Sequence, residues 1–126
     1  MKIDHIAIMT RNLNEMIRFY VQHFGCTTSE IYSNPIKKLT TCFLSFGDGT
    51  RIELMHIEDM AYNNRQSTGG LIHLAIKIGS KEKVDDFTRK LKSVGVTIIS
   101  EPRFTGDGYY ESVISDPEGN LIELTA

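Results

Sequence analysis

Two histidines and two glutamates stand at matching places in the two halves of the chain. Residues 5–8 read His-Ile-Ala-Ile and residues 73–76 read His-Leu-Ala-Ile, so that His5 and His73 open similar segments. Glu53 and Glu123 likewise occupy the fifth place of two similar segments, residues 49–54 and 119–124. Imidazole nitrogens and carboxylate oxygens are common ligands of divalent transition metals. If the fold brings these four side chains together, they supply a full set of ligands for one ion.

Strand alternation predicts which surface these side chains share. In a strand, neighbouring side chains point to opposite faces, so the His5 side chain points away from the face that carries Ile6 and Ile8. By the same rule the Glu53 side chain points away from the face of Ile52 and Leu54. In the second half, His73 and Glu123 alternate with hydrophobic residues in the same way. A single histidine or glutamate on a strand is more often structural or solvated, and a duplicated strand can keep its residues without function. Four such residues at matching places favour metal binding, with His5, Glu53, His73 and Glu123 on a concave face.

The elements that must position these residues follow the same order in each half. Hydrophobic alternation predicts strands at residues 2–9, 26–33, 39–46 and 50–55, and again at residues 71–78, 96–100, 109–115 and 121–125, with residues 101–103 as a loop. A helix follows the first strand of each half. Asn12 and Ser80 are predicted N-caps, and Gly25 and Gly95 are predicted to end these helices.

This order predicts an α+β fold of two βαβββ modules. The modules cover about residues 1–56 and 71–126, and a polar linker covers about residues 57–70. We expect the two modules to form a curved, cleft-bearing mixed sheet with the helices on its convex side. Because neither half is large enough to be stable alone, we predict a single domain over residues 1–126.

The overall composition excludes several kinds of partner. The net charge is −2 and 40% of residues are hydrophobic, which is ordinary for a globular protein. No basic cluster predicts nucleic-acid binding, and no apolar run approaches the roughly 20 residues that cross a bilayer. The charged amino terminus does not resemble a signal peptide, so we expect a cytoplasmic protein. The expected partner is a small-molecule substrate.

Four further residues are candidates for contacts with that substrate. Arg51 and Met55 share a strand face with Glu53 by alternation, and Arg51 could hold an anionic group or pair with a nearby acid. Tyr109 and Tyr110 follow a glycine-rich loop that could act as a lid. Because they are adjacent on a strand, one of the two is expected in the core and the other beside the substrate.

At these residues the chain resembles the vicinal oxygen chelate superfamily. This superfamily contains glyoxalases, bleomycin-resistance proteins, ring-cleaving dioxygenases and methylmalonyl-CoA epimerases. The resemblance covers essentially the whole chain. It runs through the strands at residues 4–8 and 72–76, the helix with Phe19 and Phe24, and the specific ending Asp-Pro-Glu-Gly-Asn at residues 116–120.

The ligand set most resembles that of bacterial glyoxalase I, which has His, Glu, His and Glu at these places. The resemblance implies a lyase or isomerase that converts the hemithioacetal of an α-oxoaldehyde and a thiol into a 2-hydroxyacyl thioester through an enediolate. It implies that Glu123 is the catalytic base, and that Glu53 is a ligand that takes part in reprotonation. Two imidazoles and two carboxylates suit nickel, cobalt or zinc.

The end of the site that would hold glutathione departs from the pattern. Where glutathione-using glyoxalases have an arginine late in the first strand, this chain has Met9. Those enzymes have an asparagine beyond the first glutamate ligand, where this chain has His56 and Ile57. They also have a lysine in the loop before the seventh strand, where this chain has Thr105, Gly106 and Asp107. The thiol co-substrate, glutathione or another, therefore stays open.

Other readings of the same fold also stay open. An extradiol-type dioxygenase could use His5, His73 and Glu123 on iron, and an epimerase or a thiol transferase could use the same surface. A module that only binds a small molecule would need no metal. The resemblance also implies a homodimer whose active sites join His5 and Glu53 of one subunit to His73 and Glu123 of the other. Some members of the superfamily instead pair the two modules within one chain, so that arrangement stays open.

Overall fold

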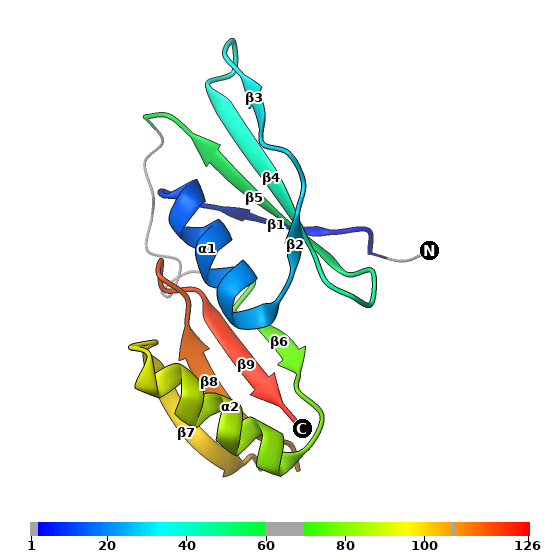
Figure 1. Cartoon of the computed structure of the whole chain (residues 1–126), viewed down its shortest axis with the longest axis vertical. Helices are drawn as coiled ribbons and strands as arrows, with labels where there is room; N and C mark the ends of the chain where they lie inside the picture. Colours follow the sequence, from blue (N-terminus) through cyan, green and yellow to red (C-terminus); the bar gives the residue numbers. More distant parts are fainter. Residues whose placement is uncertain (1–2, 60–69, 107) are drawn as a thin grey trace. The chain divides into compact units, whose positions relative to one another are not determined.

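The computed structural model describes residues 3–59, 70–106 and 108–126. The chain divides into two compact units, Met1–Asn64 and Arg65–Ala126. Figure 1 shows the elements of each unit in sequence colours. Each unit has its own sheet, its own helix and its own candidate residues.

The first unit is a mixed five-stranded sheet with one helix. Its elements are β1 (Ile6–Met9), α1 (Leu13–Phe24), β2 (Thr27–Thr28), β3 (Tyr32–Asn34), β4 (Leu39–Ser45) and β5 (Arg51–Ile57). The strand order is β1-β5-β4-β2, and β3 also pairs with β4. Strand β1 runs parallel to β5, whereas the other pairs are antiparallel. The helix crosses from the end of β1 to the start of β2 (Figure 1).

The second unit repeats this design with four strands. Its elements are β6 (His73–Lys77), α2 (Lys81–Ser93), β7 (Ile98–Phe104), β8 (Tyr110–Ser115) and β9 (Leu121–Thr125). The strand order is β6-β9-β8-β7, and β6 runs parallel to β9. Both units therefore place their first strand beside their last strand. The predicted α+β class with two repeated modules is confirmed.

The starts of both helices and the end of α1 match the sequence signals. The Asn12 side chain accepts a hydrogen bond from the backbone N–H of Glu15, and the Ser80 hydroxyl accepts one from that of Lys83. These bonds satisfy donors that the first helical turn leaves unpaired. Gly25 ends α1 with a φ of 65°, a left-handed conformation that glycine adopts without steric cost.

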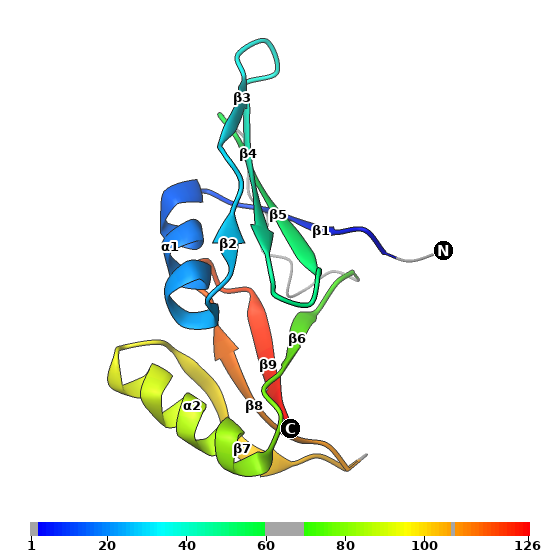
Figure 2. The same ribbon diagram turned by 45° about the vertical axis from the view of Figure 1, so that its right-hand side comes forward.

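Each helix covers one face of its own sheet and closes a small core there. In the first unit this core includes Met16 and Tyr20 of α1 and Leu44 and Leu54 of the sheet, all fully buried. In the second unit it includes Val84 and Leu91 of α2 together with Ile114, Ile122 and Leu124. Figure 2 shows α1 against the sheet of the first unit and α2 against that of the second. The opposite sheet faces carry Glu53 and Glu123, with His5 and His73 beside them.

Several predicted element boundaries are wrong. The single strand predicted for residues 26–33 is two short strands, β2 and β3. The predicted loop at residues 101–103 belongs to β7, where register shifts accommodate a proline between Ser100 and Arg103. Strand β5 continues to Ile57, which was assigned to the linker. Residues 60–69 of the predicted linker lie outside the described residues.

The two helices are short. Helix α1 has 12 residues and α2 has 13. Among the residues that the structure describes, no helix is both long enough and apolar enough to cross a bilayer.

Candidate metal centre

The first unit brings His5 and Glu53 side by side. Strands β1 and β5 pair in parallel with Ile6 opposite Ile52 and Ala7 opposite Glu53. His5 lies one residue before β1, so it belongs to the face of Ala7 and Glu53. Its Nε2 atom lies 3.6 Å from Oε2 of Glu53. The parallel pairing thus joins a nitrogen and an oxygen donor that are far apart in sequence.

The second unit repeats this arrangement with His73 and Glu123. Strands β6 and β9 pair with Leu74 opposite Ile122 and Ala75 opposite Glu123, which is the same register as in the first unit. The Nε2 atom of His73 lies 3.3 Å from Oε2 of Glu123. Each unit therefore carries one His-Glu pair on the sheet face that its helix does not cover.

Both pairs fit the requirements of a divalent transition metal. Nitrogen and oxygen ligands at about 2.0–2.2 Å from one ion lie about 3.0–3.5 Å apart. The separations of 3.6 Å and 3.3 Å are close to this range. The histidine side chains are each 36% exposed, and the side chains of Glu53 and Glu123 are 16% and 20% exposed. The donor atoms are thus partly shielded and still accessible.

Each pair supplies only two ligands. Over residues 3–59, 70–106 and 108–126, no group of three or more histidine, cysteine, aspartate or glutamate side chains lies close enough to hold a metal ion. A two-ligand pair leaves most positions around an ion to water or to other groups. Neither pair by itself is a complete protein site for such an ion.

Three side chains surround the first pair. The Nδ1 atom of His5 lies 2.9 Å from Oδ2 of Asp4. Arg51 donates a hydrogen bond from Nη2 to the same carboxylate oxygen. The Phe43 ring makes an edge contact with the His5 ring at 5.2 Å and lies 4.8 Å from the Arg51 guanidinium carbon. The hydrogen bond from His5, together with the positive charge of Arg51, lowers the pKa of the Asp4 carboxyl.

The second pair has a different neighbour on its sheet face. Glu111 and Val113 of β8 stand opposite Thr125 and Glu123 of β9, so Glu111 shares the face of Glu123. Glu111 is only 7% exposed, and its Oε1 atom lies 3.4 Å from Nη2 of Arg103. This ion pair compensates a carboxylate that would be costly to bury alone.

The structure places the four predicted substrate contacts in different settings. Arg51 lies beside the first pair, but its guanidinium is engaged by Asp4 and not by Glu53. Met55 of β5 is half-buried, pairs with Met9 of the neighbouring strand β1, and shares the face of Glu53. Tyr109 is 58% exposed before β8. Tyr110 lies on the helix side, where its hydroxyl donates to Oδ1 of Asp85 at 2.7 Å, so it is not brought together with Glu123.

Comparison with known proteins identifies the family. The family model described as the Glyoxalase/Bleomycin resistance protein/Dioxygenase superfamily matches residues 2–124. The chain belongs to this superfamily. Mitochondrial methylmalonyl-CoA epimerase from Dictyostelium discoideum is 31% identical over 133 residues, which cover 98% of this chain and 76% of that protein.

Solved structures of the superfamily have the same fold. A glyoxalase family protein from Enterococcus faecalis has a TM-score of 0.83 and 25% identity, and the match covers 99% of this chain and 97% of that chain. Glyoxalase I from Zea mays has a TM-score of 0.80 and 25% identity. That match covers 98% of this chain and 44% of the maize chain, so the present chain spans less than half of the maize enzyme.

Within this superfamily, the positions that differ from glutathione-using members can now be located. Met9 is half-buried in β1 and faces Met55. His56 lies on the helix side of β5, where its Nδ1 atom is 2.9 Å from the carbonyl oxygen of Thr10. Thr105 follows β7 and accepts a hydrogen bond from the backbone N–H of Tyr109. Asp107 lies outside the described residues.

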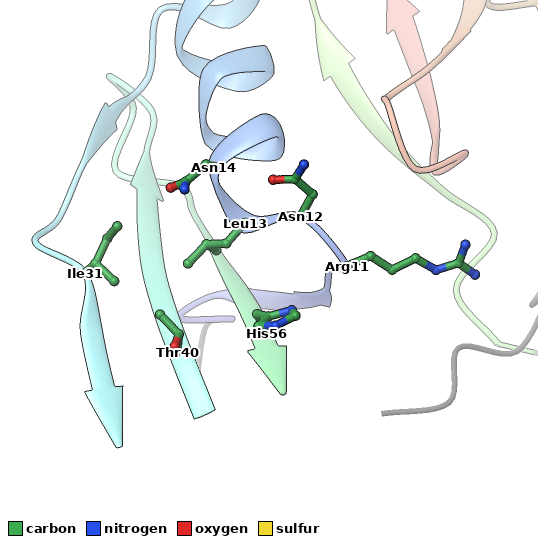
Figure 3. A pocket seen from close by; sticks show the side chains of 7 residues that line it. All are labelled: Arg11, Asn12, Leu13, Asn14, Ile31, Thr40 and His56. Atoms are coloured by element: carbon green, nitrogen blue, oxygen red, sulfur yellow. The ribbon is translucent and has the colours of Figure 1, made fainter. Parts of the chain in front are cut away.

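A cavity of about 300 Å³ lies on the helix side of the first unit, away from the His-Glu pair. Its lining, drawn in Figure 3, consists of Arg11, Asn12, Leu13, Asn14, Ile31, Thr40 and His56. His56 and Thr40 alternate with Glu53 and Phe43 on their strands and therefore face the other side of the sheet. The cavity is not part of the candidate metal centre.

Asp4 is the residue that the sequence prediction missed. Its neighbour in the chain, His5, was identified because the pattern repeats, whereas Asp4 has no counterpart in the second half, where Ile72 stands. The signal available in the sequence was an acidic residue next to a candidate histidine ligand. Its significance depends on a contact with Arg51, which only the paired strands create.

Proposed function

We propose that the protein is a metal-dependent isomerase of the glyoxalase I type. It would act on the hemithioacetal of an α-oxoaldehyde and a thiol, or on a related small molecule with two adjacent oxygens. The observation that carries the proposal is the presence of two His-Glu pairs in the same strand register, at 3.6 Å and 3.3 Å. Membership of the superfamily over residues 2–124 supports it.

In this proposal the two pairs bind one divalent ion together. His5, Glu53, His73 and Glu123 would be the ligands, and nickel, cobalt and zinc all suit two imidazoles and two carboxylates. When bound, such an ion supplies Lewis-acid stabilisation of negative charge on the substrate oxygens. In the alternative of an extradiol-type dioxygenase, His5, His73 and Glu123 would hold iron, and Glu53 would lie near the ion without binding it.

Glu123 is the proposed catalytic base. A proton would move from the substrate carbon that carries sulfur to the Glu123 carboxylate, leaving an enediolate, and would return to the adjacent carbon. The product thioester is an isomer of the hemithioacetal, so the step needs no oxidant or reductant. The Glu123 side chain is 20% exposed, which leaves its carboxylate accessible to a substrate. Glu53, in the same place in the first unit, is the proposed partner in reprotonation.

The proposal is tested by substituting the base. The purified protein is loaded with nickel, cobalt or zinc in turn and assayed with methylglyoxal and a panel of thiols that includes glutathione. We expect Glu123→Gln to lower kcat by about 10²–10⁴-fold, since this is the usual contribution of a general base. Glu30→Gln, at an exposed loop position, is the matched control and should behave as wild type.

Elemental analysis separates the enzyme from a module that only binds a small molecule. An enzyme of this type should retain about one divalent ion for each set of four ligands, and removing that ion should abolish turnover. Protein that binds no ion after reconstitution, and is inactive with every thiol, would contradict the proposal.

A second candidate is an epimerase of an acyl thioester. It is favoured by the 31% identity to methylmalonyl-CoA epimerase. Epimerases of this superfamily also remove a proton from carbon, but they typically have glutamine where Glu53 stands. Metal-loaded protein in deuterated buffer discriminates the two: deuterium incorporation into methylmalonyl-CoA, with no conversion of methylglyoxal and thiol, would favour the epimerase.

A further inference from the structure

The two His-Glu pairs differ in the hydrogen-bond partner of the histidine Nδ1 atom. In the first unit the Nδ1 atom of His5 is 2.9 Å from the Asp4 carboxylate. The residue before His73 is Ile72, which is 64% exposed and offers no hydrogen-bonding side chain. Within the described part of the chain, Nδ1 of His73 makes no hydrogen bond. Both units have the histidine and the glutamate, but only His5 has a second carboxylate, on its Nδ1 atom.

Three contacts hold the Asp4 carboxylate in place. Its Oδ2 atom accepts hydrogen bonds from both His5 and Arg51. The Arg51 guanidinium also lies over the Phe43 ring, and the same ring contacts His5. We call Asp4, His5, Phe43 and Arg51 the Asp4 cluster. In the second unit Val113 and Leu121 take the sheet positions that correspond to Phe43 and Arg51, so no such cluster is formed.

A carboxylate on Nδ1 fixes the proton of the imidazole. An ionised carboxylate can only accept hydrogen bonds, so Nδ1 of His5 must carry the proton. The lone pair of a neutral His5 ring is then on Nε2, the atom 3.6 Å from Oε2 of Glu53. Carboxylates bonded to the far nitrogen of a ligating histidine orient the ring and raise its basicity, and removing them typically costs about 10–100-fold in metal affinity.

We infer that Asp4 is a positioning residue of the metal centre, and that Arg51 serves it rather than the substrate. Asp4 selects the form of His5 that presents Nε2 to the ion, and Arg51 holds the Asp4 carboxylate in place. His73 has no such support, so the two histidines are unequal ligands. This inference rests on the proposed function for its metal, but the state of the His5 ring is a property of the metal-free protein.

The first test reads the ring itself. Long-range ¹H–¹⁵N correlation spectra of the metal-free protein report which ring nitrogen of each neutral histidine carries the proton. We expect His5 to be protonated on Nδ1 in wild type, and Asp4→Ala to shift it toward the form protonated on Nε2. Ile72→Ala, at the corresponding position of the second unit, should leave both histidines unchanged. A His5 signal that is identical in wild type and Asp4→Ala would overturn the inference.

The second test measures affinity with zinc as the probe. By calorimetry, Asp4→Ala should weaken zinc binding about 10–100-fold, and Arg51→Gln should weaken it less. Ile72→Asp should strengthen binding by giving His73 the partner that it lacks. Unchanged zinc affinity in Asp4→Ala would overturn the inference. If wild type itself does not bind zinc, the proposed function fails, and the His5 spectrum alone decides the role of Asp4.

Discussion

At the scale of single residues, the family's Asp-Pro-Glu-Gly-Asn ending has a structural explanation. Asp116 is 4% exposed and closes the turn between β8 and β9. Its Oδ1 atom accepts from the backbone N–H groups of Glu118 and Asn120, and its Oδ2 atom accepts from the Asn120 side chain at 2.7 Å. Because β9 carries Glu123, this turn helps to position the candidate base.

We expect Asp116→Ala to lower the free energy of unfolding by about 2–4 kcal/mol, since it leaves shielded N–H donors without their acceptor. Urea unfolding of wild type and variant measures this. Asp116→Asn is the control, because its side-chain oxygen can still accept from the backbone, and it should lose less stability. Equal losses in the two variants would show that the charge of Asp116, and not its role as an acceptor, stabilises the turn.

At the scale of elements, a buried polar contact fixes α2 against β8. The Thr88 hydroxyl lies 2.6 Å from the Ser112 hydroxyl and 2.7 Å from the carbonyl oxygen of Val84. Thr88 is 1% exposed and Ser112 is fully buried. A hydrogen bond between two buried hydroxyls adds little to the net stability of the fold, but a buried hydroxyl left without a partner lowers that stability considerably.

A double-mutant cycle tests this contact. Thr88→Val leaves the buried Ser112 hydroxyl without its partner and should lower the free energy of unfolding by about 1–3 kcal/mol. Adding Ser112→Ala removes the unpaired group, so the double variant should recover part of that loss. Thermal or urea unfolding of the four proteins gives the coupling. Strictly additive losses would contradict a direct contact between the two hydroxyls.

The hairpin between β4 and β5 has its own titrating group. Asp48 accepts from the backbone N–H of Thr50 at 2.8 Å and from its hydroxyl at 3.1 Å. These bonds, the backbone one most of all, lower the pKa of Asp48 in the folded protein. A carboxyl whose pKa is lower in the folded state stabilises the folded protein at a pH above the pKa of the unfolded chain, about 3.9. This stabilisation disappears as the pH falls through the lower pKa of the folded state.

We therefore expect wild type to lose stability more steeply than Asp48→Asn as the pH falls below about 4. Asparagine can still accept from Thr50 but does not titrate in this range. Denaturant unfolding at a series of acidic pH values compares the two proteins. Parallel curves would mean that the turn gains nothing from the charge of Asp48.

At the scale of the whole molecule, the duplicated units explain why the candidate ligands come in two pairs. Each unit builds the same parallel strand pair and presents one histidine and one glutamate. Each unit alone is short of a full ligand set, so the proposed centre requires two units to meet. They can belong to one chain or to two copies of it, and we propose the homodimer with shared sites.

Mixing two inactive variants decides between these arrangements. In a homodimer with shared sites, one mixed dimer of His5→Ala and Glu123→Ala contains one intact site and one doubly altered site. With full subunit exchange, half of the dimers are mixed, so about one quarter of the wild-type activity should return. Native mass spectrometry confirms the exchange. Mixed dimers without any recovered activity would place each site within a single chain.

Much of the fold was predictable because its signals are local. The capping residues Asn12 and Ser80, the helix end at Gly25 and the hairpin after β4 depend on residues a few positions apart, and the structure confirms them. The boundaries that were wrong depend on neighbours in the sheet. Glu101–Arg103 reads as a loop because of its proline, yet pairing with β8 makes it part of a bulged strand.

The sequence by itself determined which residue types face each side of the sheets, because alternation along a strand has a fixed period of two. It therefore indicated that His5 shares a face with Ala7, and Glu53 with Met55. Only the tertiary structure decided that Ala7 stands opposite Glu53, that Asp4 binds both His5 and Arg51, and that Tyr110 bonds to Asp85. These contacts depend on the register between strands and on the packing of side chains distant in sequence, and no local pattern encodes either of them.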